Sequence, residues 1–442
     1  MPFVEAALEP FLGRSQGGLV ALLFAAFFLP LSAGCASAGL GDRPPLLTNP
    51  PRHAAWADAP ASEEPSKYEG IFRLPLSEDW SWELPDTGHW TLNRLELGGA
   101  TIAGDTVLVG SSRSPGLEIL DRTTGRSLQS VAMPGPVQAH PLQVGDDWIV
   151  ADTFGNVQRF DASWTPVWET PYGAGAAIYR APILVGELLV FSTGADTVLG
   201  VHVETGVSEW SFTREVARGS LELAILGSPS AVVAGDHVVV GFSDGSISGL
   251  DPKIGVERWR EQVGGGKFPD VQAEALVVGD LLVAGAFGGP LIALDIATRT
   301  RRGENPTAGA TSAMTVAGGM IYTTDVQGRL VCIDATNGQE AWKWEYKEAQ
   351  LGTPVRAGGS ILVGDVGGTV HAVDRFEGTH QWSYQPTDGT RLAGVAAAAT
   401  VEGRQVLFTT SGGSVRSMIA AELSGGAQPE QPSQRPDRSL GW

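Results

Sequence analysis

Cysteine is almost absent from this sequence, because only Cys35 and Cys332 occur among 442 residues. The two lie far apart in the chain, so there is no vicinal pair and no spacing pattern of a disulfide framework. Cys332 stands inside the apolar run 330–333 and is most simply interpreted as a small buried hydrophobic residue. Disulfide bonds are therefore not expected to hold this fold together.

Basic residues are also scarce. The chain has 30 Lys and Arg against 49 Asp and Glu, for a formal net charge of −19. Nucleic acid is not expected as a partner, because phosphate binding needs basic patches and none is visible. Apolar residues make up 43% of the chain, and 58 glycines interrupt it. This composition supplies a large core with many tight turns.

Sequence patterns of catalytic and metal sites are missing as well. The letters G-x-S-x-G occur at Gly241–Gly245 (GFSDG), but residues 243–246 (SDGS) are typical of a hairpin turn and not of a nucleophile elbow. Gly264-Gly265-Gly266-Lys267 lacks the first Gly and the final Ser or Thr of a phosphate-binding loop. Nothing assembles a nucleophile, a base and an orienting group. We expect a protein that is not an enzyme, with no catalytic, cofactor-binding or metal-binding residues. No metal-ligand pairing such as H-x-x-x-H occurs among the histidines, which are His53, His89, His140, His202, His237, His371 and His380.

The one long apolar run lies near the N-terminus, from Gly17 to Cys35. It is short for a membrane span and contains Pro30, which favours a secretory signal. Its end, Leu31-Ser-Ala-Gly-Cys35, resembles a bacterial lipobox, although Ser32 stands where Leu is usual. The resemblance implies lipidation of Cys35; the alternative is an ordinary cleaved signal with a chance cysteine.

The segments that flank the central part have a different composition. After a lipoprotein-type signal peptide over residues 1–34, residues 35–68 are rich in Pro and Ala and are predicted to form a disordered tether. Residues 422–442 have the same character and are predicted to form a disordered tail.

Between these segments one phrase recurs: a Gly turn followed by an apolar strand. The intervals between the turn glycines are 41, 41, 49, 44, 39, 40 and 45 residues. Each unit contains four short apolar strands separated by tight turns, as in an antiparallel meander. Four strands per period of about 40 residues is the signature of a β-propeller blade. The turn glycines are Gly104, Gly145, Gly186, Gly235, Gly279, Gly318, Gly358 and Gly403.

Two further letters recur in most units. An Asp follows an apolar residue at the end of the third strand, where it can accept hydrogen bonds from turn amides. A Trp follows seven or eight residues later and is expected to wedge between blades, with its indole N–H bonded to a carbonyl. The blade-one and blade-five stretches, 126–130 and 299–303, lack this Trp. The repeat residues are Asp121, Asp161, Asp251, Asp295, Asp334 and Asp374, followed by Trp168, Trp210, Trp259, Trp342 and Trp382.

The last unit lacks the Asp–Trp half of the phrase, and the segment before the first unit offers Trp80–Leu84 (WSWEL) instead. We predict that residues 76–86 supply the outer strand of the last blade and so remove an exposed edge. The predicted fold class is all-β: an eight-bladed β-propeller of four-stranded antiparallel blades over residues 69–421.

The repeat resembles the PQQ-type propeller repeat, G-x-V-x-A-L-D-x-x-T-G-x-x-x-W, which Gly328–Trp342 (GRLVCIDATNGQEAW) matches almost letter for letter. Eight such repeats behind a lipobox resemble the BamB-like family of outer-membrane assembly lipoproteins. The resemblance implies a lipid-anchored, monomeric scaffold in the β-barrel assembly machinery. It would face the periplasm, and its only contact with the membrane would be the anchor. Ala36 occupies the place of the inner-membrane retention Asp, which favours the outer membrane.

The family also implies a partner surface, in which two loops bind a POTRA domain of the barrel insertase BamA. The first family loop reads L-x-L-R-G; here Leu223 and Ile225 match, but Leu226 replaces the Arg. The second reads D-V-D; here Asp270 matches and Gln272 replaces the second Asp. The structural alternative is that these residues simply pack on the ring.

Other functions stay open at this point. A quinone-dependent dehydrogenase or another ligand-binding periplasmic propeller shares the repeat, although such dehydrogenases typically use Ca²⁺ and a vicinal Cys pair. The repeated Asp residues are spread around the ring and cannot converge on one Ca²⁺. A surface lipoprotein with a different protein client is a third alternative.

Overall fold

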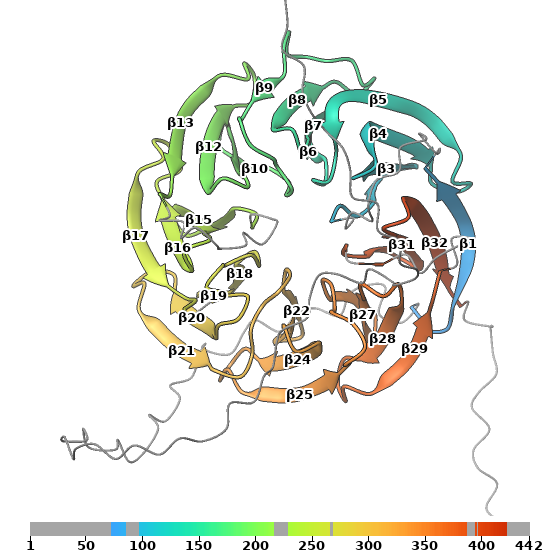
Figure 1. Cartoon of the computed structure of the whole chain (residues 1–442), viewed down its shortest axis with the longest axis vertical. Helices are drawn as coiled ribbons and strands as arrows, with labels where there is room; N and C mark the ends of the chain where they lie inside the picture. The colour runs from blue at the N-terminus through green and yellow to red at the C-terminus, as the bar shows by residue number, and fades with distance from the viewer. Residues whose placement is uncertain are drawn as a thin grey trace, which may run out of the picture. The chain divides into compact units, whose positions relative to one another are not determined.

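A computed structural model of the chain describes residues 72–84, 97–215, 229–265, 268–386, 394–395 and 397–421. These residues form 32 β-strands, arranged in eight antiparallel sheets of four strands. Figure 1 shows the eight sheets as the blades of a ring. The predicted all-β, eight-bladed propeller is confirmed. In the described part of the chain, no helix has the length and apolar character that a membrane crossing requires.

Each blade begins at the centre of the ring with two strands joined by a tight turn. The central glycines of these eight turns all have φ between 57° and 64°, a conformation that glycine adopts without steric cost. The first and second strands of blades 1 to 8 are β2 Thr101–Ala103 and β3 Thr106–Ser111, β6 Leu142–Val144 and β7 Asp147–Ala151, β10 Ile183–Val185 and β11 Leu188–Ser192, β14 Val232–Ala234 and β15 His237–Gly241, β18 Leu276–Val278 and β19 Leu281–Gly285, β22 Thr315–Ala317 and β23 Met320–Thr324, β26 Val355–Ala357 and β27 Ser360–Gly364, and β30 Thr400–Glu402 and β31 Gln405–Thr409.

The third and fourth strands continue each blade towards the outside of the ring. In blades 1 to 8 they are β4 Ser114–Asp121 and β5 Ser127–Pro136, β8 Asn156–Phe160 and β9 Tyr172–Gly173, β12 Thr197–His202 and β13 Ser208–Thr213, β16 Ser246–Leu250 and β17 Glu257–Gln262, β20 Leu291–Asp295 and β21 Arg301–Asn305, β24 Arg329–Asp334 and β25 Glu340–Glu345, β28 Val370–Asp374 and β29 His380–Tyr384, and β32 Ser414–Ala420 and β1 Leu76–Glu83.

Because the strands alternate in direction, the connections fall on two opposite faces of the ring. We call "turn face" the side with the turns between first and second strands and between third and fourth strands. We call "loop face" the side with the turns between second and third strands and the loops between successive blades.

The N-terminal strand closes the ring. In blade 8, β1 is the outer strand and pairs antiparallel with β32, from Leu76 opposite Ala420 to Glu83 opposite Ser414. Figure 1 shows β1, in blue, outside the red β32. The segment that the sequence suggested for ring closure is found at this place, where it covers an otherwise open strand edge.

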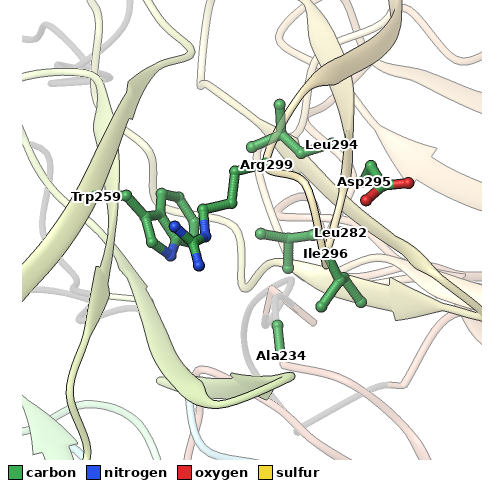
Figure 2. Close-up of a pocket in the computed structure, with 7 residues that line it drawn as sticks. All are labelled: Ala234, Trp259, Leu282, Leu294, Asp295, Ile296 and Arg299. Atoms are coloured by element: carbon green, nitrogen blue, oxygen red, sulfur yellow. The ribbon is translucent and has the colours of Figure 1, made fainter.

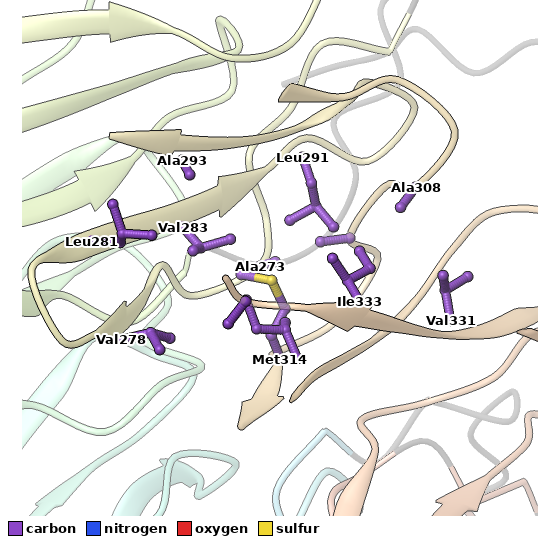
Figure 3. Packing of buried hydrophobic residues seen from close by; sticks show 13 residues of the cluster. Ala273, Val278, Leu281, Val283, Leu291, Ala293, Ala308, Met314, Val331 and Ile333 are labelled. Atoms are coloured by element: carbon purple, nitrogen blue, oxygen red, sulfur yellow. The ribbon is translucent and has the colours of Figure 1, made fainter. Parts of the chain in front are cut away.

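The core consists of apolar layers between neighbouring blades. Second and third strands are almost fully buried; all five residues of both β19 and β20 are, for example. Figure 3 shows the layer between blades 5 and 6, in which Val283 and Leu291 of blade 5 pack with Ile333 of blade 6. A blade has two apolar faces, and only a ring can bury both.

Four tryptophans connect four pairs of blades: Trp80, Trp210 and Trp342 on outer strands, and Trp168 a few residues before β9. Each indole ring lies against a glycine in the turn between the third and fourth strands of the next blade. The indole N–H donates to a backbone carbonyl of the same turn. The four donor–acceptor distances are 2.8 Å for Trp80 to Arg122, 3.2 Å for Trp168 to Val203, 3.0 Å for Trp210 to Pro252, and 3.0 Å for Trp342 to Arg375.

The other four interfaces, which follow blades 1, 4, 5 and 7, differ from this arrangement. Blade 1 lacks the Trp, and there Trp164 of blade 2 occupies the glycine position, at φ 65°, and stacks on Trp148 with ring centroids 5.7 Å apart. Blade 5 has Gly303 at the Trp position, opposite Ala293. Trp382 of blade 7 packs in the apolar layer shared with blade 8.

The repeated Asp side chains close their own turns. Each of the six accepts at least one hydrogen bond from a backbone amide two to four residues later, for example Asp334 from Thr336 at 2.8 Å. These bonds lower the pKa of the Asp121 and Asp161 carboxyl groups, where a side-chain hydroxyl of the same turn makes the largest contribution.

Candidate functional site

The second of the two predicted partner loops falls on the loop face. Leu223, Ile225 and Leu226 lie outside the described residues, as does Cys35. Asp270 and Gln272 lie in the loop between blades 4 and 5, which leads from β17 to β18. The structure therefore describes the second of the two predicted loops.

That second loop is held tightly by its neighbours. The amide of Val271 donates to the carbonyl of Phe242 at 3.1 Å, and the amide of Phe287 donates to the carbonyl of Asp270 at 2.8 Å. The Val271 side chain is buried and packs against Gly241. A Cβ atom added to Gly241 would lie only 2.5 Å from Cγ1 of Val271. The loop backbone is thus fixed between blades 4 and 5.

The side chains of this loop offer little exposed charge. Asp270 is only 9% exposed, and the buried Nε2 of Gln272 has no hydrogen-bond partner within the described ranges. Phe268, in contrast, is 41% exposed. A partner on this loop would meet an aromatic ring and backbone before it reached the carboxylate.

Other apolar side chains reach the solvent from turns of the same face. Phe154 is 66% exposed, Val326 47% and Val366 41%. They lie in the turns between second and third strands of blades 2, 6 and 7. Single exposed apolar residues are common on protein surfaces, but together with Phe268 these give one face several apolar tips on rigid turns.

Arg214 fixes the chain just before the first predicted loop. Its guanidinium lies over the rings of Phe212 and Phe242, at 5.2 and 5.0 Å, and donates to Ser248 at 2.7 Å and to Glu257. Burial alone would raise the pKa of Glu257, but the hydrogen bonds from Ser248 and Arg214 outweigh it and lower that pKa. Blades 3 and 4 are therefore joined where the chain leaves β13.

A polar cluster that the sequence did not indicate lies around the axis. The loops before the innermost strands of blades 2, 3 and 5 bring His140 and Glu274 each within electrostatic reach of Arg180. Burial and the positive charge of Arg180 lower the pKa of His140 to about 4. Burial raises the pKa of Glu274, against the opposing effects of Ser230 and Arg180. Only the place of these residues before each first strand could have signalled them.

A second buried pair lies between blades 6 and 7. Nε2 of His371 is 3.0 Å from Oδ2 of Asp365, and the imidazole contacts Trp344 and Tyr346, at centroid distances of 5.1 and 4.5 Å. Desolvation would raise the pKa of Asp365, but the hydrogen bonds from His371, from the Thr369 amide and from Tyr346 together outweigh it and lower that pKa. Within the described ranges, no three His, Cys, Asp or Glu residues gather in a way that could hold a metal ion.

A small pocket opens on the turn face between blades 4 and 5 (Figure 2). It comprises about 220 Å³ of space that is open to solvent, with room at its base for about one water molecule. It is lined by Ala234, Trp259, Leu282, Leu294, Asp295, Ile296 and Arg299.

Comparison with known proteins gives a consistent picture. The family model described as outer membrane protein assembly factor BamB matches residues 149–344 and 304–439. A curated relative of that name from Shewanella oneidensis is 25% identical over 180 residues, which are 38% of this chain and 43% of the relative. The chain therefore aligns with less than half of that relative's length.

Solved structures share the fold. BamB from Moraxella catarrhalis superimposes with a TM-score of 0.66 at 18% identity, over 78% of this chain and all of that chain. A quinohemoprotein alcohol dehydrogenase from Pseudomonas putida superimposes with a TM-score of 0.62 at 14% identity, over 85% of this chain and 80% of that one. At these identities the likeness shows the propeller architecture alone.

Proposed function

Because the chain belongs to the family of outer membrane protein assembly factor BamB, we propose that it is a non-enzymatic adaptor in outer-membrane protein assembly. It binds a POTRA-type domain of a β-barrel insertase through its loop face. The observation that carries this proposal is the combination of rigid turns and apolar tips on that face. Phe268 and Phe154 are exposed there, while Val271 and the loop backbone are fixed.

Rigidity matters because an adaptor gains affinity when its contact surface needs no ordering on binding. Residues 268–275 are anchored by backbone hydrogen bonds to two blades, and Arg214 anchors the chain just after β13. Exposed apolar and aromatic side chains on such supports are typical binding anchors.

Lipid attachment places this surface at the membrane. Acyl chains on Cys35 would contribute roughly 0.8 kcal/mol for each buried CH₂ group, so several chains anchor firmly. The tether of residues 36–68 then lets the ring reach a partner without entering the bilayer. The adaptor works from the periplasmic side of the outer membrane.

Binding between purified components tests the loop assignment. Residues 36–442 are immobilised and titrated with the soluble POTRA region of the host's own barrel insertase. We expect Leu223→Glu and Ile225→Glu to weaken binding at least tenfold. Val207→Glu, the same kind of change at a 58% exposed position on the turn face, serves as the control and leaves binding unchanged.

Substitutions of Asp270 distinguish a direct contact with the partner from a role in supporting the loop. If its carboxylate contacts the partner, both Asp270→Asn and Asp270→Lys weaken binding while the urea midpoint of Asp270→Asn stays near that of the unmodified protein. Unchanged binding of both variants would refute the assignment of this loop.

A second candidate function is ligand binding on the axis. The cluster of His140, Arg180 and Glu274 favours it, since charged groups that converge on a concave region are typical of ligand sites. Reconstitution with Ca²⁺ and pyrroloquinoline quinone, followed by a dye-linked alcohol oxidation assay, tests it. Turnover would establish the redox function and contradict the adaptor as the whole account.

A further inference from the structure

The interface between blades 4 and 5 has the tryptophan of the outer strand but not the hydrogen bond that the indole N–H makes at four other interfaces. Trp259 occupies the usual position on the outer strand of blade 4, but its buried Nε1 has no hydrogen-bond partner among the residues that the structure describes. Across the interface, the glycine position of the blade 5 turn holds Arg299, at φ 60°. An L-residue other than Gly or Asn in this conformation costs roughly 1–2 kcal/mol. The chain therefore carries both an unpaired donor and backbone strain at one place.

Arg299 is also unpaired, unlike the arginines beside it. Within the described ranges its side chain makes no ion pair or hydrogen bond, whereas the side chain of Arg301 bonds Glu261 at 2.6 Å and that of Arg302 bonds the carboxylate of Asp295. Figure 2 shows the Arg299 side chain extending towards Trp259, above the apolar side chains of Leu282 and Ile296. The guanidinium of Arg299 and the indole ring of Trp259, whose Nε1 is itself buried, thus line a pocket with an apolar floor.

We propose that this pocket binds the carboxylate of an acidic side chain presented by a partner protein. A carboxylate accepts charge-assisted hydrogen bonds from a guanidinium such as that of Arg299, and bonds of this kind are among the strongest. The carboxylate of Asp295 does not compete, because it is held by Arg302 and by the amide of Thr298 at 2.7 Å.

The size of the pocket favours a side chain over a free small molecule. Pockets for small molecules usually measure about 300–1,000 Å³, whereas this one is open to solvent and has room for only about one water molecule, or one carboxylate oxygen. The rest of a partner segment would meet exposed apolar side chains of the same face, since Ile254 is 54% exposed and Val256 47%. The site lies on the turn face, opposite the second predicted partner loop, and does not depend on the proposed function.

The test follows the indole resonance of Trp259. Protein of residues 36–442 is labelled with ¹⁵N-tryptophan, and Trp259→Phe identifies the signal. The probes are propionate and the capped peptide acetyl-Val-Ala-Glu-Ala-Val-amide. Propionamide and the Gln version of the peptide are the uncharged controls. We expect the Trp259 signal to shift saturably with both carboxylates and to remain in place with both amides.

Two variants locate the effect. Arg299→Gly restores the glycine of the repeat and relieves the strained φ, so it should fold with an unchanged or higher urea midpoint. It should weaken propionate and peptide binding at least tenfold. Lys253→Gly removes a cation from the turn of blade 4 outside the pocket and should leave binding unchanged.

Several results would overturn the proposal. These are no shift with propionate, an equal shift with propionamide, undiminished binding by Arg299→Gly, or an equal loss in Lys253→Gly. A shift with propionate but none with the Glu peptide would refute a protein segment as the occupant.

Discussion

The indole of Trp210 lies directly on Gly255 of the next blade, where a Cβ atom would stand only 2.3 Å from the ring. Gly255 also has φ 69°, so glycine is required there for two independent reasons. The indole N–H completes the contact through the carbonyl of Pro252 at 3.0 Å. Where this pair occurs, the Trp of one blade and the Gly of the next thus make the two blades fit together.

Gly255→Ala should therefore destabilise the ring strongly. The positive φ costs roughly 1–2 kcal/mol, and overpacking against Trp210 adds about 1–3 kcal/mol. Urea denaturation measures the change. Gly104→Ala is the matched control, because Gly104 has φ 60° but no atom within 4 Å of the added Cβ. Equal losses in the two variants would show that the Trp contact contributes nothing.

Trp164→Gly should destabilise the protein, although it restores the glycine that most other blades have at this position of the turn. It relieves a positive φ, but it removes the ring that stacks on Trp148 and replaces the Trp missing from blade 1. Loss of a large buried aromatic side chain costs about 3–5 kcal/mol, so a net loss of about 2–3 kcal/mol is expected by urea denaturation. A neutral or stabilising result would mean that Trp164 does not fill the blade 1–2 interface.

Trp80→Ala tests the closure of the ring. Trp80 is 8% exposed, lies on Gly125 of blade 1 and donates to Arg122 at 2.8 Å. A loss of about 3–5 kcal/mol is expected, with earlier proteolysis of the N-terminal strand. Ser77→Ala, on the same strand but exposed, is the control. If Trp80→Ala unfolded at the same urea concentration as Ser77→Ala, β1 would not hold the ring closed.

His140 should make stability depend on pH. Its folded pKa is about 4, below the ordinary value of 6.5, because burial and Arg180 disfavour the charged ring. Between these values the unfolded chain binds a proton that the folded chain does not, so folding stability falls as the pH drops from 6.5 to 4.

The contribution of His140 is isolated by comparison with His140→Gln. The unmodified protein should lose roughly 1–3 kcal/mol more than this variant between pH 7 and pH 4, as measured by urea denaturation at each pH. Parallel pH profiles of the two proteins would contradict a shifted pKa for His140.

Much of the fold could be predicted because the repeat places recognisable residues at the turns and at the blade interfaces. A glycine every 40 residues or so marks a positive φ, and the Trp of each outer strand marks a blade interface. Trp80, with the strand that contains it, could be placed in blade 8 because the last unit lacked its own outer half. Local turn chemistry and hydrophobic patterning agree here with the global fold.

The candidate sites were less predictable for physical reasons. Asp270 was identified as a charged surface position, but its 9% exposure depends on how two blades enclose the loop, which no local pattern encodes. The meeting of His140, Arg180 and Glu274 depends on ring geometry across three blades. The pocket at Trp259 became visible only when Arg299 was found at the glycine position with no carboxylate to pair with.

The most direct test of the account is co-purification of the full-length protein from detergent-solubilised envelopes. We predict that affinity-tagged protein, still lipidated at Cys35, retains a β-barrel insertase with POTRA domains. The Leu223→Glu Ile225→Glu double variant, at equal abundance in the outer membrane, should lose it. Recovery of the protein without any such insertase, together with quinone-dependent turnover, would contradict the adaptor function.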